Sequence, residues 1–355
     1  MSNETSNELK TTLQAARYGK DKVRVLRVVR EGAWHHVVEY NVTALLEGDI
    51  DVRPRAVSTS NNMGVSPYMD TKTLAICIIN NSVVVATDSI KNITYYLAKI
   101  SPHVLVPEHF ALHLGTHFVA RYAHIHKAFI TVEQLRWTRI PLNNTQSDEG
   151  KEKGHTHSFY RDGDDKRIVK VEVDASKGKD HLIGHVTSGI SDLLVLKSTG
   201  SSFSNFVRDE YTTLAEVSDR IFSTAVDLQY AFAPVRIPAP ADAKQLDFPL
   251  GDFMKADGSV WDAVGVAERA RRVTLEVFAE DESASVQATL YKMAQLLLAQ
   301  NAGVQSVTYS LPNKHFIPVD MRYIGVENVT PPEKAEVFMP ISAPSGLISA
   351  TISRK

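Results

Sequence analysis

Cysteine is almost absent from this sequence. Its 355 residues include one, Cys77, which excludes an intrachain disulfide and a zinc site built from cysteines. No apolar run reaches the roughly 18 residues that a membrane-spanning helix needs, and the first residues, MSNETSNELK, lack the apolar core of a signal peptide. We therefore expect an intracellular protein with no membrane segment.

A surplus of charge of one sign is also lacking. The 39 basic and 41 acidic residues nearly cancel, so no overall field favours nucleic acid or an anionic membrane as a partner. A small anionic ligand would have to be held by a local arginine. Hydrophobic residues make up 43% of the chain, which is typical of a packed protein, and the length suffices for two domains or for one domain repeated.

The hydrophobic pattern of the first half predicts two strands, two helices and two further strands. Residues 23–29 and 38–46 have the pattern of strands. Residues 83–85 predict a short buried strand, followed by a helix capped by Thr87 or Asp88. The order strand, strand, helix therefore opens the fold.

A second helix and a second pair of strands follow. Apolar residues at spacing four predict a helix after Pro107, with one face formed by Phe110, Leu114, Phe118 and Tyr122. Residues 130–140 and 157–173 predict strands, and residues 162–165 predict a turn inside the second of these. The first half thus has the order ββααββ.

The second half repeats this order. Strands are predicted at residues 193–196, 227–232, 304–311 and 347–353. Two helical faces lie between them, formed by Val266, Ala270, Val273 and Val277 and by Leu290, Met293 and Leu297. We predict an α+β protein with two tandem ββααββ units, residues 15–176 and 177–355. Because helices would cover only one face of each sheet, we expect an oligomer whose sheets join edge to edge.

One stretch of the second half carries candidate binding residues. The segment LVLKSTGSSFSNFVRDEYTTLAEVSDR contains Phe203, Leu214 and Arg220, and SVQATLYKM contains Val286 and Gln287 at the start of a helix. Backbone N–H groups at a helix start favour an anion, an arginine and a glutamine can grip a flat, amide-rich heterocycle, and a phenylalanine can stack on it. This chemistry suits a purine. Taken singly, the same residues also fit a plain hydrophobic core and a surface arginine.

Three further motifs are unspecific on their own. LPNKHF contains Asn313 and His315, ARYGKDKVRV contains Lys20, and ATDSIKN contains Thr87. They also fit a strand histidine, a surface lysine and a helix cap. Taken together and in their order along the chain, however, the five motifs resemble the urate oxidase (uricase) family, above all its fungal members. The resemblance runs from about residue 15 to about residue 352.

The resemblance implies the tunnelling fold, with four subunits forming a barrel as a homotetramer and active sites at the subunit interfaces. It also implies the roles of the site residues. Arg220 and Gln287 would hold urate, Phe203 would stack beneath it, and the Val286 backbone, Leu214 and Ile348 would complete the pocket. Asn313 and Thr87 would frame a cavity for dioxygen, and Asp88 would join Thr87 in coming from the neighbouring subunit. Lys20, Thr87 and His315 would form a proton relay, since a desolvated lysine gives up its proton more readily.

The implied reaction needs no cofactor and no metal. Urate as a dianion is electron-rich enough to pass an electron to dioxygen, so the protein need only remove a proton and hold the reactants. The products would be 5-hydroxyisourate and hydrogen peroxide. His155 and His157 could lie on one strand face as zinc ligands, but the sequence shows no third ligand beside them.

The sequence departs from the family pattern in three places. About 20 extra residues lie within residues 52–80, either as a surface loop or as a translated intron. Ser204 and Asn205 follow the stacking phenylalanine where relatives often have Trp-Gly. The tripeptide Ser353-Arg354-Lys355 is an imperfect peroxisomal signal, so we expect a peroxisomal protein with the cytoplasm as the alternative.

Two functions from different classes follow. The first is an active, cofactor-independent urate oxidase of purine catabolism. The second is a purine-binding or structural assembly protein of the tunnelling fold that the insert has inactivated.

Overall fold

The structure is a computed structural model that describes residues 16–49, 83–142, 154–238, 240, 261–331 and 334–355. The predicted insert at about 52–80 therefore lies outside the described residues. None of the helices within these ranges is long and apolar enough to cross a membrane.

The chain follows the order ββααββ twice. The first half comprises β1 (Tyr18–Glu31), β2 (Trp34–Gly48), α1 (Thr87–Ile100), α2 (Pro107–Arg121), β3 (Ile125–Arg139) and β4 (Phe159–Asp174). The second half comprises β5 (Leu182–Lys197), β6 (Phe222–Phe232), β7 (Val235–Ile237), α4 (Ala263–Glu280), α5 (Val286–Gln300), β8 (Val304–Pro318), the 3-10 turn η2 (Arg322–Ile324), β9 (Phe338–Ile341) and β10 (Leu347–Ser353). The predicted α+β class and the repeated order are confirmed, while β7 and β9 were not predicted.

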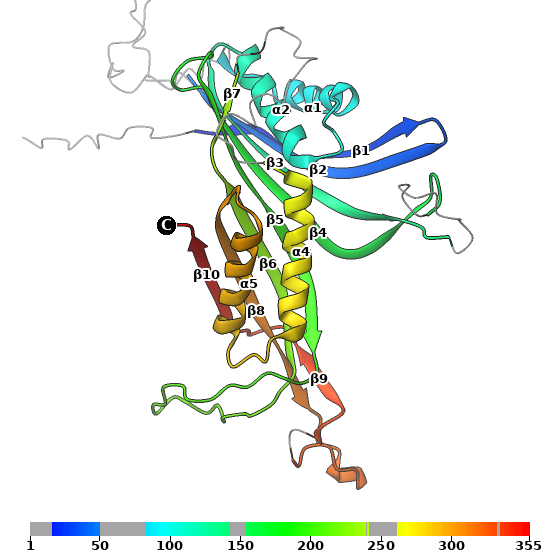
Figure 1. Ribbon diagram of the computed structural model, residues 1–355, viewed down its shortest axis with the longest axis vertical. Helices are drawn as coiled ribbons and strands as arrows, with labels where there is room; N and C mark the ends of the chain where they lie inside the picture. The colour runs from blue at the N-terminus through cyan, green and yellow to red at the C-terminus, as the bar shows by residue number, and fades with distance from the viewer. Residues whose placement is uncertain (1–15, 50–82, 143–153, 239, 241–260, 332–333) are drawn as a thin grey trace, which may run out of the picture.

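All the strands belong to one antiparallel sheet, in the order β1-β2-β3-β4-β5-β6-β8-β10. β4 pairs with β5, so the sheet continues from one half into the other without a break. α1 and α2 pack over the strands of the first half, and α4 and α5 over those of the second (Figure 1). The division into units 15–176 and 177–355 stays a prediction.

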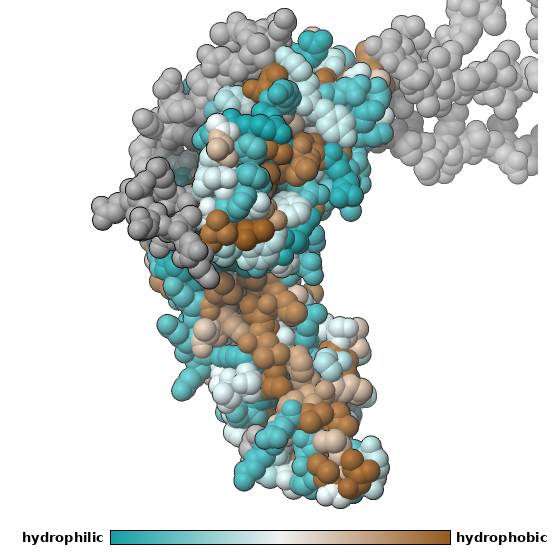
Figure 2. All heavy atoms as spheres, turned by 90° about the vertical axis from the view of Figure 1, so that its right-hand side faces the viewer, coloured by the Kyte–Doolittle hydropathy of each residue, from teal (hydrophilic) through white to brown (hydrophobic). Residues whose placement is uncertain are grey.

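The face of the sheet opposite the helices leaves apolar surface open within the described chain. Leu26 on β1 and Leu194 and Leu196 on β5 are each more than half exposed. These three residues alternate with the buried Val25, Leu193 and Val195, as expected for a strand with one covered and one open face. Figure 2 shows a further hydrophobic band along the lower half of the molecule.

An ion pair buried in the core joins the two halves. Glu108 on α2 is fully buried, and Arg167 on β4 donates to it from Nε at 3.1 Å and from Nη2 at 2.7 Å. Ser188 on β5 donates to the same carboxylate at 2.5 Å, and Arg167 also donates to the carbonyl of Ala263 at the start of α4. A buried charge is tolerated only when it is paired and hydrogen-bonded in this way. The residues come from both halves, so their packing is shared.

The prediction of a strand at residues 83–85 was wrong. This segment pairs with no strand, and the backbone N–H of Val85 instead donates to the Tyr18 hydroxyl at 3.0 Å. The predicted cap was wrong as well, because the N-cap of α1 is Ala86, with no side-chain hydrogen bond. Thr87 is the first helical residue, and Asp88 in the first turn accepts bonds from Lys91 and Asn92. An acidic residue there is favoured by the helix dipole.

The prediction of a turn at residues 162–165 was also wrong, because β4 continues through them. The register jumps from Leu135 opposite Lys166 to Trp137 opposite Arg161, so residues 162–165 face Arg136 alone. The Arg136 guanidinium donates to the carboxylates of Asp162 and Asp165 at 2.8 Å each. Acidic residues and a glycine resemble a turn in sequence, but here an arginine on the next strand holds them as an irregularity within the sheet.

Candidate functional site

The predicted binding residues of the second half include an unpaired cation above an aromatic ring. The Arg220 guanidinium carbon lies 5.2 Å from the centroid of the Phe203 ring. Arg220 Nε is buried with no hydrogen-bond partner, and within the described residues Arg220 makes no ion pair. Burial lowers the pKa of this guanidinium below its ordinary value. The group therefore has hydrogen-bond donors and a charge that no acid of the described chain neutralises.

The loop that carries Arg220 is held in shape by the residue before it. The Asp219 carboxylate accepts hydrogen bonds from Thr199 Oγ1 at 2.5 Å, from the Gly200 N–H at 2.8 Å and from the Ser201 N–H at 3.4 Å. The hydrogen bond from Thr199 is the largest cause of the lowered pKa of Asp219. The Arg220 N–H in turn donates to the Ser201 carbonyl at 2.9 Å. Asp219 thus links the two ends of the long β5–β6 loop.

The same loop is fastened to the start of α5. The Ser202 N–H donates to the Ser283 carbonyl at 2.9 Å, and the Ser283 N–H donates to the Gly200 carbonyl at 3.0 Å. Ser285 caps α5 by accepting from the Ala288 N–H. Val286 and Gln287 therefore begin a helix whose entry is tied to the segment bearing Phe203.

The other predicted pocket residues of the second half lie around this loop. Asn313 on β8 pairs with Thr224 on β6, four residues after Arg220, and Ile348 on β10 pairs with Leu311 on β8. Leu214 lies on the β5–β6 loop and is half exposed. The structure thus places the predicted residues Asn313 and Ile348 on strands next to the β6 end of this loop, while Leu214 lies further along the loop.

The predicted proton-transfer residues of the first half form a second group. Lys20 lies on β1, and Thr87 and Asp88 begin α1. The pKa of the Asp88 carboxyl is lowered, mainly by its hydrogen bond from Lys91, and the charge of Lys20 is one of the smaller causes. Lys20 and Asp88 are therefore neighbours.

A single chain does not bring the two groups together. Four strands separate β1 from β6 in the sheet, which at about 4.8 Å per step corresponds to roughly 24 Å. His315 lies on β8, one strand further still from Lys20.

The histidines considered as metal ligands lie close together. The ring centroids of His155 and His157 are 4.5 Å apart. Across the ranges that the structure describes, no group of three or more histidines, cysteines or carboxylates could hold a metal ion.

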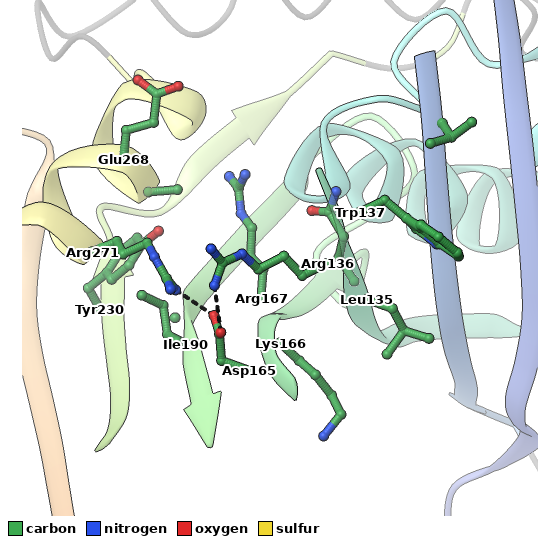
Figure 3. Close-up of a pocket in the computed structure, with 14 residues that line it drawn as sticks. Leu135, Arg136, Trp137, Asp165, Lys166, Arg167, Ile190, Tyr230, Glu268 and Arg271 are labelled. Atoms are coloured by element: carbon green, nitrogen blue, oxygen red, sulfur yellow. Dashed lines mark hydrogen bonds and ion pairs between the residues drawn. The ribbon is translucent and has the colours of Figure 1, made fainter. Parts of the chain in front are cut away.

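A cavity of about 250 Å³ lies away from both groups, between β3, β4, β5 and α4. None of the predicted site residues lines it. Figure 3 shows Arg136 and Arg271 converging on Asp165, whose carboxylate is paired to both guanidiniums. The cations that face one another here are thus neutralised by an internal acid, which distinguishes them from Arg220.

The ββααββ order, repeated within one antiparallel sheet, defines an α+β protein of the tunnelling type. The family model described as uricase matches residues 16–172 and 186–349, and the chain belongs to the uricase family. It is 42% identical over 348 residues to the uricase of Emericella nidulans, covering 97% of this chain and 98% of that one. It is 41% identical to the uricase of Aspergillus flavus, covering 97% of each chain. The crystal structure of uricase from Arthrobacter globiformis has a TM-score of 0.72 and 30% identity, over 98% of this chain and 96% of that one.

Sequence reasoning missed the residues that hold the site together. Asp219 and Ser283 had no assigned role, although Asp219 lies inside the quoted loop motif and Ser283 lies two residues before SVQATLYKM. Asn205 has φ +57°, in the left-handed region that glycine and asparagine tolerate best. The glycine that relatives often have at this position could have predicted this conformation, because few other residues adopt it.

Proposed function

We propose that this protein is a cofactor-independent urate oxidase, which converts urate, dioxygen and water to 5-hydroxyisourate and hydrogen peroxide. The observation that carries the proposal is Arg220, a partly buried guanidinium with no acid partner in the described chain, held above Phe203. A planar anion that stacks on the ring would supply the missing acceptor. The uricase names of the relatives fit such a ligand.

In this proposal, one set of residues binds urate and a second set transfers its proton. Arg220 and Gln287 hold the ring in its plane, with Phe203 below it and the Val286 backbone, Leu214 and Ile348 at its border. Asn313 and Thr87 frame the position of dioxygen. Lys20, Thr87 and His315 move the proton that urate must lose before it can pass an electron to dioxygen.

Consumption of oxygen tests this proposal most directly. Adding urate to the purified protein should consume dioxygen and release hydrogen peroxide in equal amounts while the absorbance of urate disappears. A purine-binding or structural protein would shift the absorbance of urate without consuming oxygen. That result would favour the second function class and overturn the first.

Each active site would be built from two chains. The roughly 24 Å between the groups within one chain supports this arrangement, and the exposed sheet edges and apolar face supply surfaces for a homotetramer. Thr87→Ala and Arg220→Ala proteins, each nearly inactive alone, should regain activity when unfolded together and reassembled. In a mixed pair one site is intact and the other carries both defects, so random pairing restores up to about one quarter of the sites. Mixed assemblies with no gain of activity would place all the residues in one chain.

The same proposal leaves two locations to be distinguished, the peroxisome and, as the alternative, the cytoplasm. Ser353 ends β10, and the Arg354 side chain donates to the carbonyls of Val304 and Asn301. This anchoring supports the cytoplasmic alternative, because a targeting receptor needs a free tripeptide. A fluorescent protein fused to the N-terminus distinguishes punctate from diffuse fluorescence.

A further inference from the structure

The strand β1 contains a bulge directly after Lys20. Lys20 pairs with Ala44 on β2, and the next pair is Val23 with Val42, so Asp21 and Lys22 together face one residue of β2. That residue is Thr43. In a regular strand, residues three apart point to opposite faces of the sheet. The extra residue cancels this alternation, so Lys20 lies on the same face as Val23.

The face that Lys20 gains is the one covered by helices. Ala44 and Val42, the partners of Lys20 and Val23, are both fully buried on that face. Tyr18, two residues before Lys20, accepts a hydrogen bond from the Val85 N–H just before α1. The contribution of Lys20 to the lowered pKa of Asp88 is consistent with this placement. Without the bulge, Lys20 would point away from the start of α1.

One hydroxyl group holds the bulge. Thr43 Oγ1 donates to Asp21 Oδ1 at 2.5 Å and accepts from the Lys22 N–H at 3.2 Å. Lys22 has φ +49°, a left-handed conformation that costs free energy in any residue with a Cβ. Hydrogen bonds from outside the strand must therefore stabilise it. Because Thr43 alternates with the buried Val42 and Ala44, it holds the bulge from the opposite face of β2.

We propose that Thr43 is a positioning residue for proton transfer by Lys20. This inference rests on the proposed function, in which Lys20 belongs to the proton relay. Thr43 acts through the bulge, by fixing the face on which Lys20 lies. It should therefore govern turnover and leave the binding of urate by Arg220 and Gln287 unchanged.

A matched pair of substitutions tests the hydroxyl. Thr43→Val keeps the shape of the side chain and removes both hydrogen bonds, whereas Thr43→Ser keeps the hydroxyl. A displacement of a reacting group by about 1 Å can lower the reaction rate by up to about a hundredfold. We expect Thr43→Val to lower kcat by between about tenfold and a hundredfold with KM for urate nearly unchanged, and Thr43→Ser to retain most of the wild-type kcat. The pH profile of kcat should shift in the valine variant alone.

A rescue variant separates positioning from general damage. Glycine adopts φ +49° without strain, so Lys22→Gly in the Thr43→Val background should restore much of kcat. If Thr43→Val does not fold, Asp21→Ala tests the same hydrogen bond from its other end. Folding is checked by circular dichroism, and urate binding by equilibrium titration under nitrogen.

Lys20→Met distinguishes failure of this inference from failure of the proposed function. Full turnover of Lys20→Met would remove Lys20 from the relay and would overturn this inference, while the oxidase activity itself would stand. Absence of turnover in the unaltered protein would instead overturn the proposed function. Loss of turnover in Lys20→Met with full turnover in Thr43→Val would overturn the positioning role alone. Equal losses in the valine and serine variants, or no rescue by Lys22→Gly, would also contradict it.

Discussion

The two halves of the chain share one element order but offer their functional residues in different ways. In the second half, Arg220 lies on an irregular loop that Asp219 and Ser283 fasten at several points. In the first half, Lys20 and Thr87 lie on secondary-structure elements, Lys20 beside the bulge of an edge strand and Thr87 in the first turn of a helix. The predicted binding group around Arg220 is therefore shaped within one chain, while Lys20 of the predicted proton relay lies at an open edge of the sheet.

In the proposed function, this difference assigns binding to the second half and proton transfer mainly to the first. A long loop between two strands can be shaped by its own side chains without disturbing the sheet. An edge strand has a free side, so its residues can serve a site that another chain completes. The following predictions test how far each half depends on its own features.

The largest effect is expected at the junction of the halves. Glu108→Ala would leave the mostly buried Arg167 without its acid and should lower the free energy of unfolding by about 3–5 kcal/mol. Urea-induced unfolding measures this loss. Glu172→Ala, which removes the partly exposed partner of Lys127, should cost at most about 1 kcal/mol. Similar losses in both variants would show that the Glu108–Arg167 pair stabilises the fold no more than an exposed pair does.

Arg220→Ala should weaken the binding groups of the second half. Loss of a charge-assisted pair with a bound anion costs about 2–5 kcal/mol, so the apparent urate constant should rise by at least about thirtyfold. Arg208→Ala is the matched control, because Arg208 lies on the same loop above Phe206 and is exposed. Steady-state kinetics with urate compares them. An unchanged constant in Arg220→Ala would remove Arg220 from the site.

Acid should lower the free energy of unfolding through two buried histidines of the first half. Burial, the largest cause, lowers the pKa values of His109 and His117 on α2 to about 4. Their ordinary pKa is about 6.5, so below it the unfolded chain binds more protons than the folded one. The stability present above pH 6.5 is therefore lost as the pH falls toward 4, by at most about 3 kcal/mol per histidine.

His117→Gln should reduce this pH dependence. Urea unfolding at pH 7 and pH 5 gives the decline for each protein. His185→Gln, at an exposed histidine on β5, is the control and should decline as the wild type does. A decline of wild-type size in His117→Gln would mean that another group causes the acid sensitivity.

The smallest effect is expected for Asp219→Ala, which removes the acceptor that shapes the binding loop. A hydrogen bond to a charged acceptor contributes about 1.5–3 kcal/mol to stability. Because the loop positions Arg220, part of this loss should appear as a rise of about tenfold in the apparent urate constant. Asp209→Ala removes a comparable acceptor for Tyr211 and Thr212 on the same loop and should leave urate binding nearly unchanged. Equal apparent urate constants for the two variants would contradict the role of Asp219 in shaping the binding loop.

The sequence predicted the parts of the fold that depend on repeated burial. The helices around Val266 and Met293 and the main strands bury one face, so their periodicity is visible in the residues themselves, whereas α2 around Phe110 is buried on nearly all sides. Three valines at 83–85 were misinterpreted because a short apolar run does not specify whether another strand lies beside it. The role of Thr43 could not be predicted, because it depends on which residue of β2 faces the bulge.

For the site, the motifs predict residues but not their arrangement. Arg220, Phe203 and Gln287 are predicted from motifs and stay predictions, whereas Asp219 was missed because its contacts are with backbone groups that only the folded loop brings within reach. The separation of Lys20 from Arg220 follows from the order of strands in the sheet, which the hydrophobic pattern does not contain.

The two ends of the sheet set a limit on how copies of this chain can add to one another. β1 and β10 each carry a row of backbone N–H and C=O groups with no partner strand in the described part of the chain. Repeated joining of such edges has two geometric outcomes, a closed ring of fixed size or an open fibre that keeps growing. The curvature of the sheet decides between them, because only a ring brings the last free edge back to the first. A substitution that flattens the sheet would therefore favour fibres, and it would lower the solubility of the protein even if every site residue were intact.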